Sequence, residues 1–144
     1  AEELRSQGTK FYMLCGRPEK EVVHAEEGYA LGKVDGYSYA GWPGRVYHTR
    51  ASQRVLAIEL EVPPSSQGIL RLYIADPDHF MGGRKQEIRV GGKSAGVFDD
   101  FREGKWIEAP VDAAMTRGGA IRIEAENLRT QGNAVISIVE WREQ

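Results

Sequence analysis

The fold of this chain is decided by L-A-I-E-L-E-V-P-P at residues 56–64 and by G-I-L-R-L-Y-I-A-D at residues 68–76. In both stretches apolar side chains occupy every second position: Leu56, Ile58, Leu60 and Val62 in the first, and Leu70, Leu72 and Ile74 in the second. Such alternation is typical of a β-strand with one face in a core and the other in water. The spacings of three and four residues that mark an amphipathic helix are missing. Turn-forming residues end both runs, and we therefore predict antiparallel β-structure.

Other segments of the chain have the same character. Those that we expect to be strands are residues 11–16, 21–28, 29–34, 86–90, 93–98, 106–111, 120–125 and 134–141, while residues 46–50 lead into the two long stretches. Gly91 and Gly92 suit the positive φ angles of a tight hairpin turn. Asp112 is a good N-cap for one helical turn over residues 112–117. Roughly nine or ten short strands at intervals of about ten residues indicate a β-sandwich or a barrel.

The composition is that of a globular domain. The chain has 144 residues, 41% of them hydrophobic and 28% charged, which is enough to bury a core. No repeat, linker or low-complexity tract divides it, so we expect a single domain over residues 1–144, with residues 1–10 frayed or at a sheet edge. A formal net charge of −2 argues against a nucleic-acid partner, which normally requires a basic face. No apolar run approaches the roughly 20 residues that cross a bilayer, and residues 1–10 lack the apolar centre of a signal peptide.

Catalytic motifs are missing from the sequence. The three histidines, His24, His48 and His79, do not have the spacing of zinc ligands. There is no G-x-S-x-G sequence, and the glycine pairs do not precede a predicted helix. The single cysteine, Cys15, lies in the apolar run F-Y-M-L-C and is expected to be a buried thiol. We therefore predict that the protein is not an enzyme, although a carboxylate pair assembled from distant strands stays open.

An aromatic loop at residues 37–42 is the first candidate for a binding site. Sugars present apolar C–H faces and rings of hydroxyls, so their sites combine exposed aromatic planes with polar side chains. Tyr39 and Trp42 are the predicted stacking surfaces, and Tyr37 and Tyr47 lie nearby in sequence. The alternative for Trp42, which precedes Pro43, is that it packs into the end of the sandwich.

A second candidate is the loop at residues 76–84, which is long for a hairpin. We predict Asp76, Asp78 and Arg84 as partners of sugar hydroxyls, and His79 as a further candidate, because loops at the end of a rigid sandwich often carry binding residues. The two carboxylates are also of the type that binds calcium. Alternatively, Asp76-Pro77-Asp78 is a turn in which the side chains bond their own backbone.

Several other polar or aromatic residues favour a structural role. Arg122, Glu124 and Glu126 alternate with apolar residues and are expected to form a solvated face. Asn127 is expected to cap a turn. Trp106 and Trp141 are interpreted as core or sheet-edge anchors.

The chain resembles the galactose-binding-domain-like jelly rolls over about residues 55–140. The resemblance is carried by the two stretches quoted first, then by G-G-R-K-Q-E-I-R-V-G-G-K, G-K-W-I-E-A-P-V, A-I-R-I-E-A-E-N-L and G-N-A-V-I-S-I-V-E-W. In that pattern a strand ending in V-P precedes a second long strand, and a hairpin and a closing G-x-N strand follow. The superfamily includes many carbohydrate-binding modules and the malectin-like domains appended to glycoside hydrolases.

This resemblance implies an all-β jelly-roll sandwich that recognises carbohydrate without catalysis, is secreted or extracellular, and is often linked to a catalytic domain. It also implies a structural calcium ion in some modules, for which residues 22–27 resemble the acidic opening strand. We predict a carbohydrate-binding module with dissociation constants of about 10⁻³ to 10⁻⁵ M. Two alternatives stay open: a structural domain that packs against a catalytic neighbour, and a glycan-active enzyme with a carboxylate pair.

Overall fold

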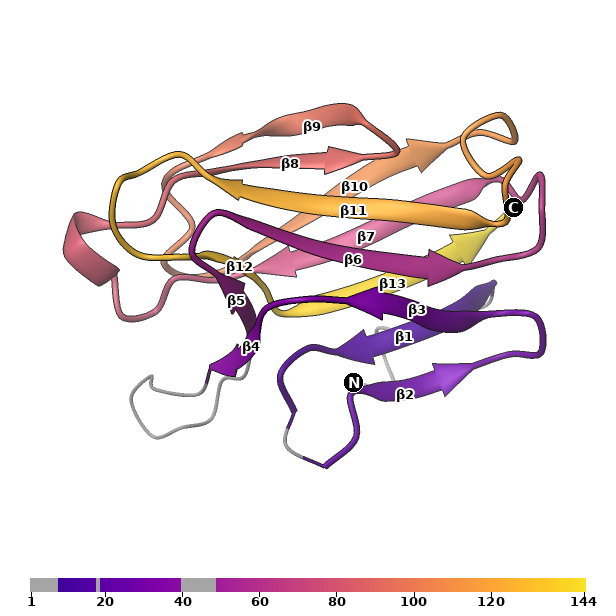
Figure 1. The fold of residues 1–144 in the computed structure, drawn as a ribbon, viewed down its shortest axis with the longest axis horizontal. Helices are drawn as coiled ribbons and strands as arrows, with labels where there is room; N and C mark the ends of the chain where they lie inside the picture. The colour runs from indigo at the N-terminus through magenta and orange to yellow at the C-terminus, as the bar shows by residue number, and fades with distance from the viewer. Residues whose placement is uncertain (1–7, 18, 40–48) are drawn as a thin grey trace.

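The computed structural model describes residues 8–17, 19–39 and 49–144. These residues form thirteen β-strands and one short 3₁₀ helix. Two five-stranded antiparallel sheets lie face to face, and a small three-stranded sheet lies at one end (Figure 1). The predicted fold class, an all-β antiparallel sandwich, is confirmed.

The three sheets are called sheet A, sheet B and sheet C, and their strands are given in the order in which they pair. Sheet A contains, in order, β10 (Lys105–Val111), β7 (Gly68–Ile74), β13 (Ile138–Glu143), β1 (Thr9–Leu14) and β2 (Val22–Ala25). Sheet B contains β3 (Ala30–Val34), β6 (Val55–Glu61), β11 (Ala120–Asn127), β8 (Gln86–Val90) and β9 (Lys93–Phe98). Sheet C contains β12 (Ala134–Ile136), β5 (Thr49–Ser52) and β4 (Tyr37–Tyr39).

The core lies between sheets A and B and follows the alternation in the sequence. Its members come from both inner faces and include Leu56, Ile58, Leu60, Leu70, Leu72, Ile74, Ile121, Ile123 and Trp141. The consecutive strands β6 and β7 lie in different sheets, because the turn at residues 62–67 carries the chain across the sandwich. Period-two patterning therefore places one side of each strand in the same core.

The structure divides two regions differently from the sequence prediction. Residues 134–141 were expected to be one strand but form β12 and part of β13, interrupted at the buried Ser137. The backbone N–H of Ser137 donates to the carbonyl of Tyr73 (2.9 Å) and its hydroxyl to Thr49 Oγ1 (3.2 Å). The strand therefore leaves sheet C at this residue and enters sheet A.

Residues 112–117 form turns and no helix. The Asp112 carboxylate nevertheless accepts a hydrogen bond from the N–H of Met115 (3.0 Å), as predicted for a cap. The turn closes when the Gly119 N–H bonds the Thr116 carbonyl (2.8 Å) and the Gly119 carbonyl accepts from Val62 (3.0 Å). The second of these bonds joins the turn to the residue that follows β6.

Cys15 is buried, as expected. Burial raises the pKa of its thiol, and the negative charge of Glu21 raises it further.

Among the described residues there is no helix with the length and hydropathy that a bilayer crossing needs.

Candidate functional site at the loop end of the sandwich

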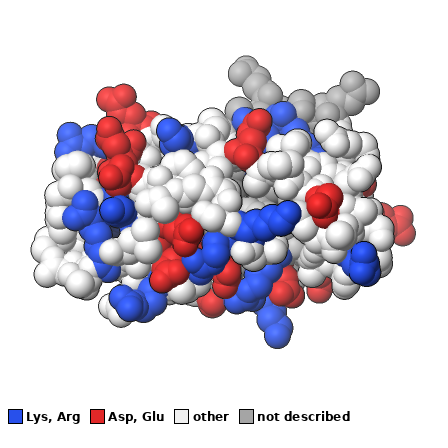
Figure 2. Space-filling model, turned by 90° about the horizontal axis from the view of Figure 1, so that it is seen from above, with Lys and Arg blue, Asp and Glu red and all other residues white. Residues whose placement is uncertain are grey.

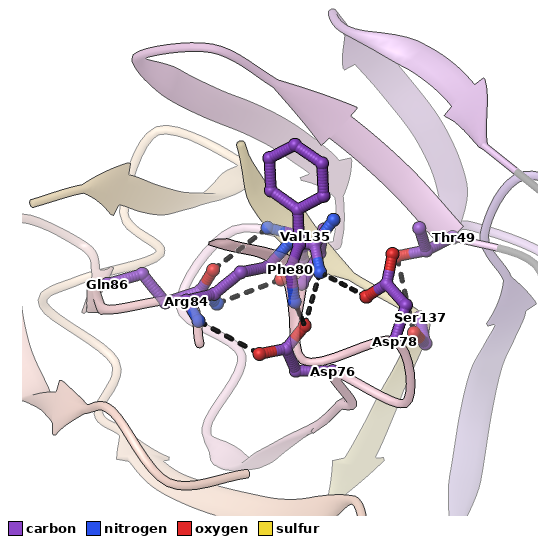
Figure 3. Close-up of polar contacts among 8 residues, drawn as sticks. All are labelled: Thr49, Asp76, Asp78, Phe80, Arg84, Gln86, Val135 and Ser137. Carbon is purple, nitrogen blue, oxygen red and sulfur yellow. Dashed lines mark hydrogen bonds and ion pairs between the residues drawn. The ribbon is translucent and has the colours of Figure 1, made fainter. Parts of the chain in front are cut away.

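The connection between β7 and β8 is held by a buried ion pair. Asp76 and Arg84 are 2% and 3% exposed, and their side chains bond each other. The Asp76 carboxylate also accepts a hydrogen bond from the backbone N–H of Arg84 (2.8 Å). Arg84 Nη1 donates a second hydrogen bond to Asp78 Oδ1 (2.8 Å) (Figure 3). Burial opposes the charged form of Arg84, but the hydrogen bonds and charges of Asp78 and Asp76 raise its pKa above the ordinary value. One guanidinium thus joins both carboxylates of the loop.

The tip of this loop presents an aromatic ring to solvent. It contains the 3₁₀ helix η3 (Phe80–Gly82), and Phe80 is 39% exposed. The flanking residues His79 and Met81 have φ angles of 47° and 52°, a conformation that costs roughly 1–2 kcal/mol per non-glycine residue. Backbone strain and an exposed aromatic side chain therefore coincide at the tip.

The Phe80 ring is supported from two sides. The Arg84 guanidinium lies 5.3 Å from the ring centroid, within the range of a cation–π contact. On the other loop, a Cβ atom at Gly132 would lie 3.2 Å from Phe80 Cδ2, so the glycine lets the ring approach the backbone. In Figure 3 the ring points away from the Asp76 and Asp78 carboxylates. The ring therefore packs between the Arg84 guanidinium and the backbone at Gly132.

The loop between β11 and β12 is built around Asn127, which caps it as predicted. The Asn127 amide nitrogen donates to the carbonyls of Gln53, Gln131 and Gly132 at 3.0, 3.2 and 3.1 Å. Its amide oxygen accepts from the N–H of Arg129 (2.9 Å). The next residue, Leu128, donates its N–H to the Lys85 carbonyl (2.9 Å) and joins this loop to the connection between β7 and β8 (residues 75–85), named here the Phe80 loop.

The aromatic loop predicted from the sequence lies largely outside the described residues. Trp42 is in residues 40–48, which the structure does not describe, and only the backbone of Tyr39 is described, as the last residue of β4. The strand that follows, β5, begins at Thr49, whose hydroxyl donates to the Ile136 carbonyl (2.7 Å). Thr49 bonds Ser137 (Figure 3), and the backbone N–H of Ser137 donates to the carbonyl of Tyr73, close to the start of the Phe80 loop. The described residue that follows the predicted aromatic loop, Thr49, is therefore linked to β7 near its end.

The predicted hydroxyl partners occupy different environments. Asp78 is 21% exposed at its side chain, and His79 is exposed. Asp76 and Arg84 are buried and directed at each other. Phe80 was not among the residues predicted to bind. Its signal in the sequence was the pair Phe80-Met81 within an otherwise polar loop.

The described carboxylates do not fit a calcium site. Asp76 and Asp78 are both bonded to Arg84, so a cation would have to displace a guanidinium. In the acidic segment near the N-terminus, Glu26 bonds Lys10 (3.1 Å) and His24 (3.4 Å). No group of three or more His, Cys, Asp or Glu side chains suited to a metal lies in the part of the chain that the structure describes.

A separate groove of about 630 Å³ opens on the side of the sandwich between the end strands β9 and β10. Its lining includes Lys93, Ser94, Glu108 and Met115, and no aromatic ring. Figure 2 views this side of the molecule and shows acidic and basic side chains interspersed, without a large region of one sign. The groove lacks the planar surfaces that the Phe80 end offers.

Two face-to-face antiparallel sheets with connections that cross between them define a β-sandwich. No family model and no curated protein sequence matches the chain. At the level of the fold, the predicted resemblance is nevertheless confirmed by solved structures with low sequence identity to this chain.

One similar structure is the ANX2 ectodomain from Arabidopsis thaliana, with a TM-score of 0.65 and 11% identity over 94% of this chain and 50% of that chain. Another is β-glucuronidase from Bacteroides uniformis, with a TM-score of 0.61 and 13% identity over 92% of this chain and 18% of that chain. A calcium-binding mutant of β-glucuronidase 2 from the same organism has a TM-score of 0.65 and 13% identity over 96% of this chain and 18% of that chain. The chain thus spans half of the ectodomain and about a fifth of the glucuronidases.

Proposed function

We propose that this protein is a non-catalytic carbohydrate-binding domain that recognises a glycan at the Phe80 end of the sandwich. The observation that supports this most directly is the exposed ring of Phe80, held on a strained turn beside an ion pair. Strain of this kind concentrates at functional sites. Tyr39 and Trp42 remain predicted stacking surfaces of the same site.

The chemistry of the loop suits a sugar. The ring offers an apolar plane for C–H groups, and Asp78 and the exposed His79 offer polar partners for hydroxyls. Asp76 and Arg84 act in this proposal by holding the ring and Asp78 in place, since rigid partners lose little entropy on binding. One ring and a few hydrogen bonds are consistent with weak, reversible binding.

The structural neighbours support the proposal by analogy. They comprise ectodomains of plant proteins and a glycosidase, and in each the matched region is part of a longer chain. We accordingly propose that the protein acts outside the cell, beside a covalently linked partner domain.

The test is a glycan array followed by calorimetric titration of a bound glycan. Phe80→Ala is expected to weaken binding about two- to tenfold, because one ring contact contributes about 0.5–1.5 kcal/mol. Val97→Ala removes an apolar side chain that is 52% exposed on β9 and serves as the control. Equal affinities of Phe80→Ala and the wild type would rule out this site. Binding to no glycan would leave the accessory-domain alternative, and hydrolysis of a bound glycan would favour the enzyme.

A further inference from the structure

Three apolar side chains are exposed at the Phe80 end of the sandwich. Phe80, Met81 and Leu128 are 39%, 59% and 43% exposed, and they are three of the five large apolar side chains that are exposed among the described residues. Leu128 lies on the loop between β11 and β12, which its bond to the Lys85 carbonyl joins to the Phe80 loop. Met81 is the most exposed of the five, so its thioether is open to reagents in solution.

The other sulfur atoms of the chain are protected. Met13 is fully buried in the core, and Met115 packs against the core with its methyl group beside Gly91. Cys15 is buried, and burial raises the pKa of its thiol, which disfavours the reactive thiolate. Oxidants dissolved in water react first with the sulfur atoms that they can reach. Met81 is therefore the sulfur atom that they modify first.

Met81 also lies in a strained turn. Its φ angle is 52°, and Gly82 and Gly83 follow with φ angles of 85° and 110°. The turn is closed by bonds from the Gly82 N–H to the His79 carbonyl (3.3 Å) and from the Gly83 N–H to the Phe80 carbonyl (3.0 Å). A sulfoxide is polar and accepts hydrogen bonds, whereas a thioether sulfur is a weak acceptor, so oxidation brings a competitor for these N–H groups and draws water to the tip. Chemistry at Met81 thus acts on the turn that presents Phe80.

We propose that Met81 is a site of reversible oxidation by hydroperoxides, and that its sulfoxide loosens the turn and weakens glycan binding at the Phe80 end. The sulfur takes the terminal oxygen atom of the hydroperoxide and loses two electrons, while the O–O bond breaks and the remaining oxygen leaves as an alcohol, or as water from hydrogen peroxide, with the hydroperoxide's own proton. A reductase with two thiols reverses the step, giving a disulfide and water. The effect on glycan binding rests on the proposed function, whereas the oxidation and the loosening of the turn do not.

The first test measures which sulfur atom is oxidised. Folded protein is treated with hydrogen peroxide for increasing times, the reaction is stopped with free methionine, and the digested protein is analysed by mass spectrometry. We expect Met81 to be oxidised at least about tenfold faster than Met13, with Met115 between them, because the rate follows exposure. Oxidation of Met13, Met115 or Cys15 as fast as Met81 would overturn the proposal.

The second test measures the effect on the turn and on binding. Amide hydrogen exchange of Gly82 and Gly83 is expected to accelerate after peroxide treatment and to return to its original rate after treatment with methionine sulfoxide reductase. The affinity for a glycan that the untreated protein binds is expected to fall about two- to tenfold. Met81→Leu, which keeps an apolar side chain of similar size, is expected to show neither response to peroxide, whereas Met115→Leu shows both.

The outcomes separate this proposal from the proposed function. Unchanged exchange and unchanged affinity after oxidation of Met81 would overturn the switch, and so would the same responses in Met81→Leu. If the untreated protein binds no glycan, the proposed function fails, and the acceleration of exchange at Gly82 and Gly83 alone then decides whether Met81 is a modification site that acts on this turn. Circular dichroism of each oxidised and substituted form establishes that it is folded.

Discussion

At the scale of single residues, Glu21 connects the turn at Gly16 to strand β5. It accepts two hydrogen bonds from Arg50, at 2.9 and 2.7 Å, and one from the N–H of Gly16 (2.6 Å). Arg50 in turn donates to the Gly36 carbonyl (3.2 Å). Burial alone would raise the pKa of Glu21, but the hydrogen bonds and charge of Arg50, together with the Gly16 N–H, hold it below its ordinary value of 4.5.

This depressed pKa predicts a stability that depends on acid. The contribution of the Glu21 carboxylate is fully present above pH 4.5 and is lost as the pH falls through the lower folded-state pKa. We expect Glu21→Gln to destabilise the protein by about 1.5–3 kcal/mol near neutral pH, because hydrogen bonds to a charge are lost. Urea unfolding at a series of pH values measures this. The difference between variant and wild type is expected to shrink below pH 4.5, and a difference independent of pH would contradict the assignment.

At the scale of elements, Gln86 connects sheets B and C. Its side-chain amide donates to the Val135 carbonyl (2.9 Å) and accepts from the Val135 N–H (2.9 Å), as a neighbouring strand would (Figure 3). Gln86 is fully buried. This pair of bonds places β12, and through it β5, beside the Phe80 loop.

Gln86→Ala is therefore expected to loosen β12. The substitution leaves a buried donor and a buried acceptor of Val135 unsatisfied, each costing about 1–3 kcal/mol. Hydrogen exchange at the Val135 amide is expected to accelerate, and the midpoint of urea unfolding to fall. The exposed Gln131 offers a control, since Gln131→Ala removes a side chain that projects into solvent. Unchanged exchange at Val135 would show that β12 is held by other contacts.

At the scale of the whole molecule, the last strand of the chain completes the centre of sheet A. β13 lies between β7 and β1, so the two ends of the chain pair with each other, Phe11 opposite Trp141. Trp141 is fully buried in the core. Such long-range pairing makes the fold cooperative and slow to form.

Truncation after Ser137 is accordingly expected to prevent folding. It removes the central strand of sheet A and the indole of Trp141, and it exposes the edges of β1 and β7. Circular dichroism with thermal unfolding measures the outcome, and deletion of Gln144 alone is the control. A cooperative transition in the truncated protein would show that sheet A is stable without its centre.

Much of the framework follows from local patterns. Alternation placed Leu56 through Ile74 in strands with a buried face, and the glycine pair after Val90 identified a hairpin whose strand bounds, 86–90 and 93–98, are those in the structure. Caps at Asp112 and Asn127 were also predicted, because a side chain that bonds its neighbours' backbone needs only a short sequence to do so.

The sequence by itself determined the strands, their turns and their buried sides, since period-two patterning and turn chemistry act over a few residues. Only the tertiary structure decided that Asp76 and Arg84 bury one another, that Phe80 is turned outward, and that Trp106 stands beside Tyr73. Trp106 and Tyr73 are more than thirty positions apart in the chain and meet through strand register. Register and sheet order depend on contacts made across the whole molecule, which no local pattern specifies.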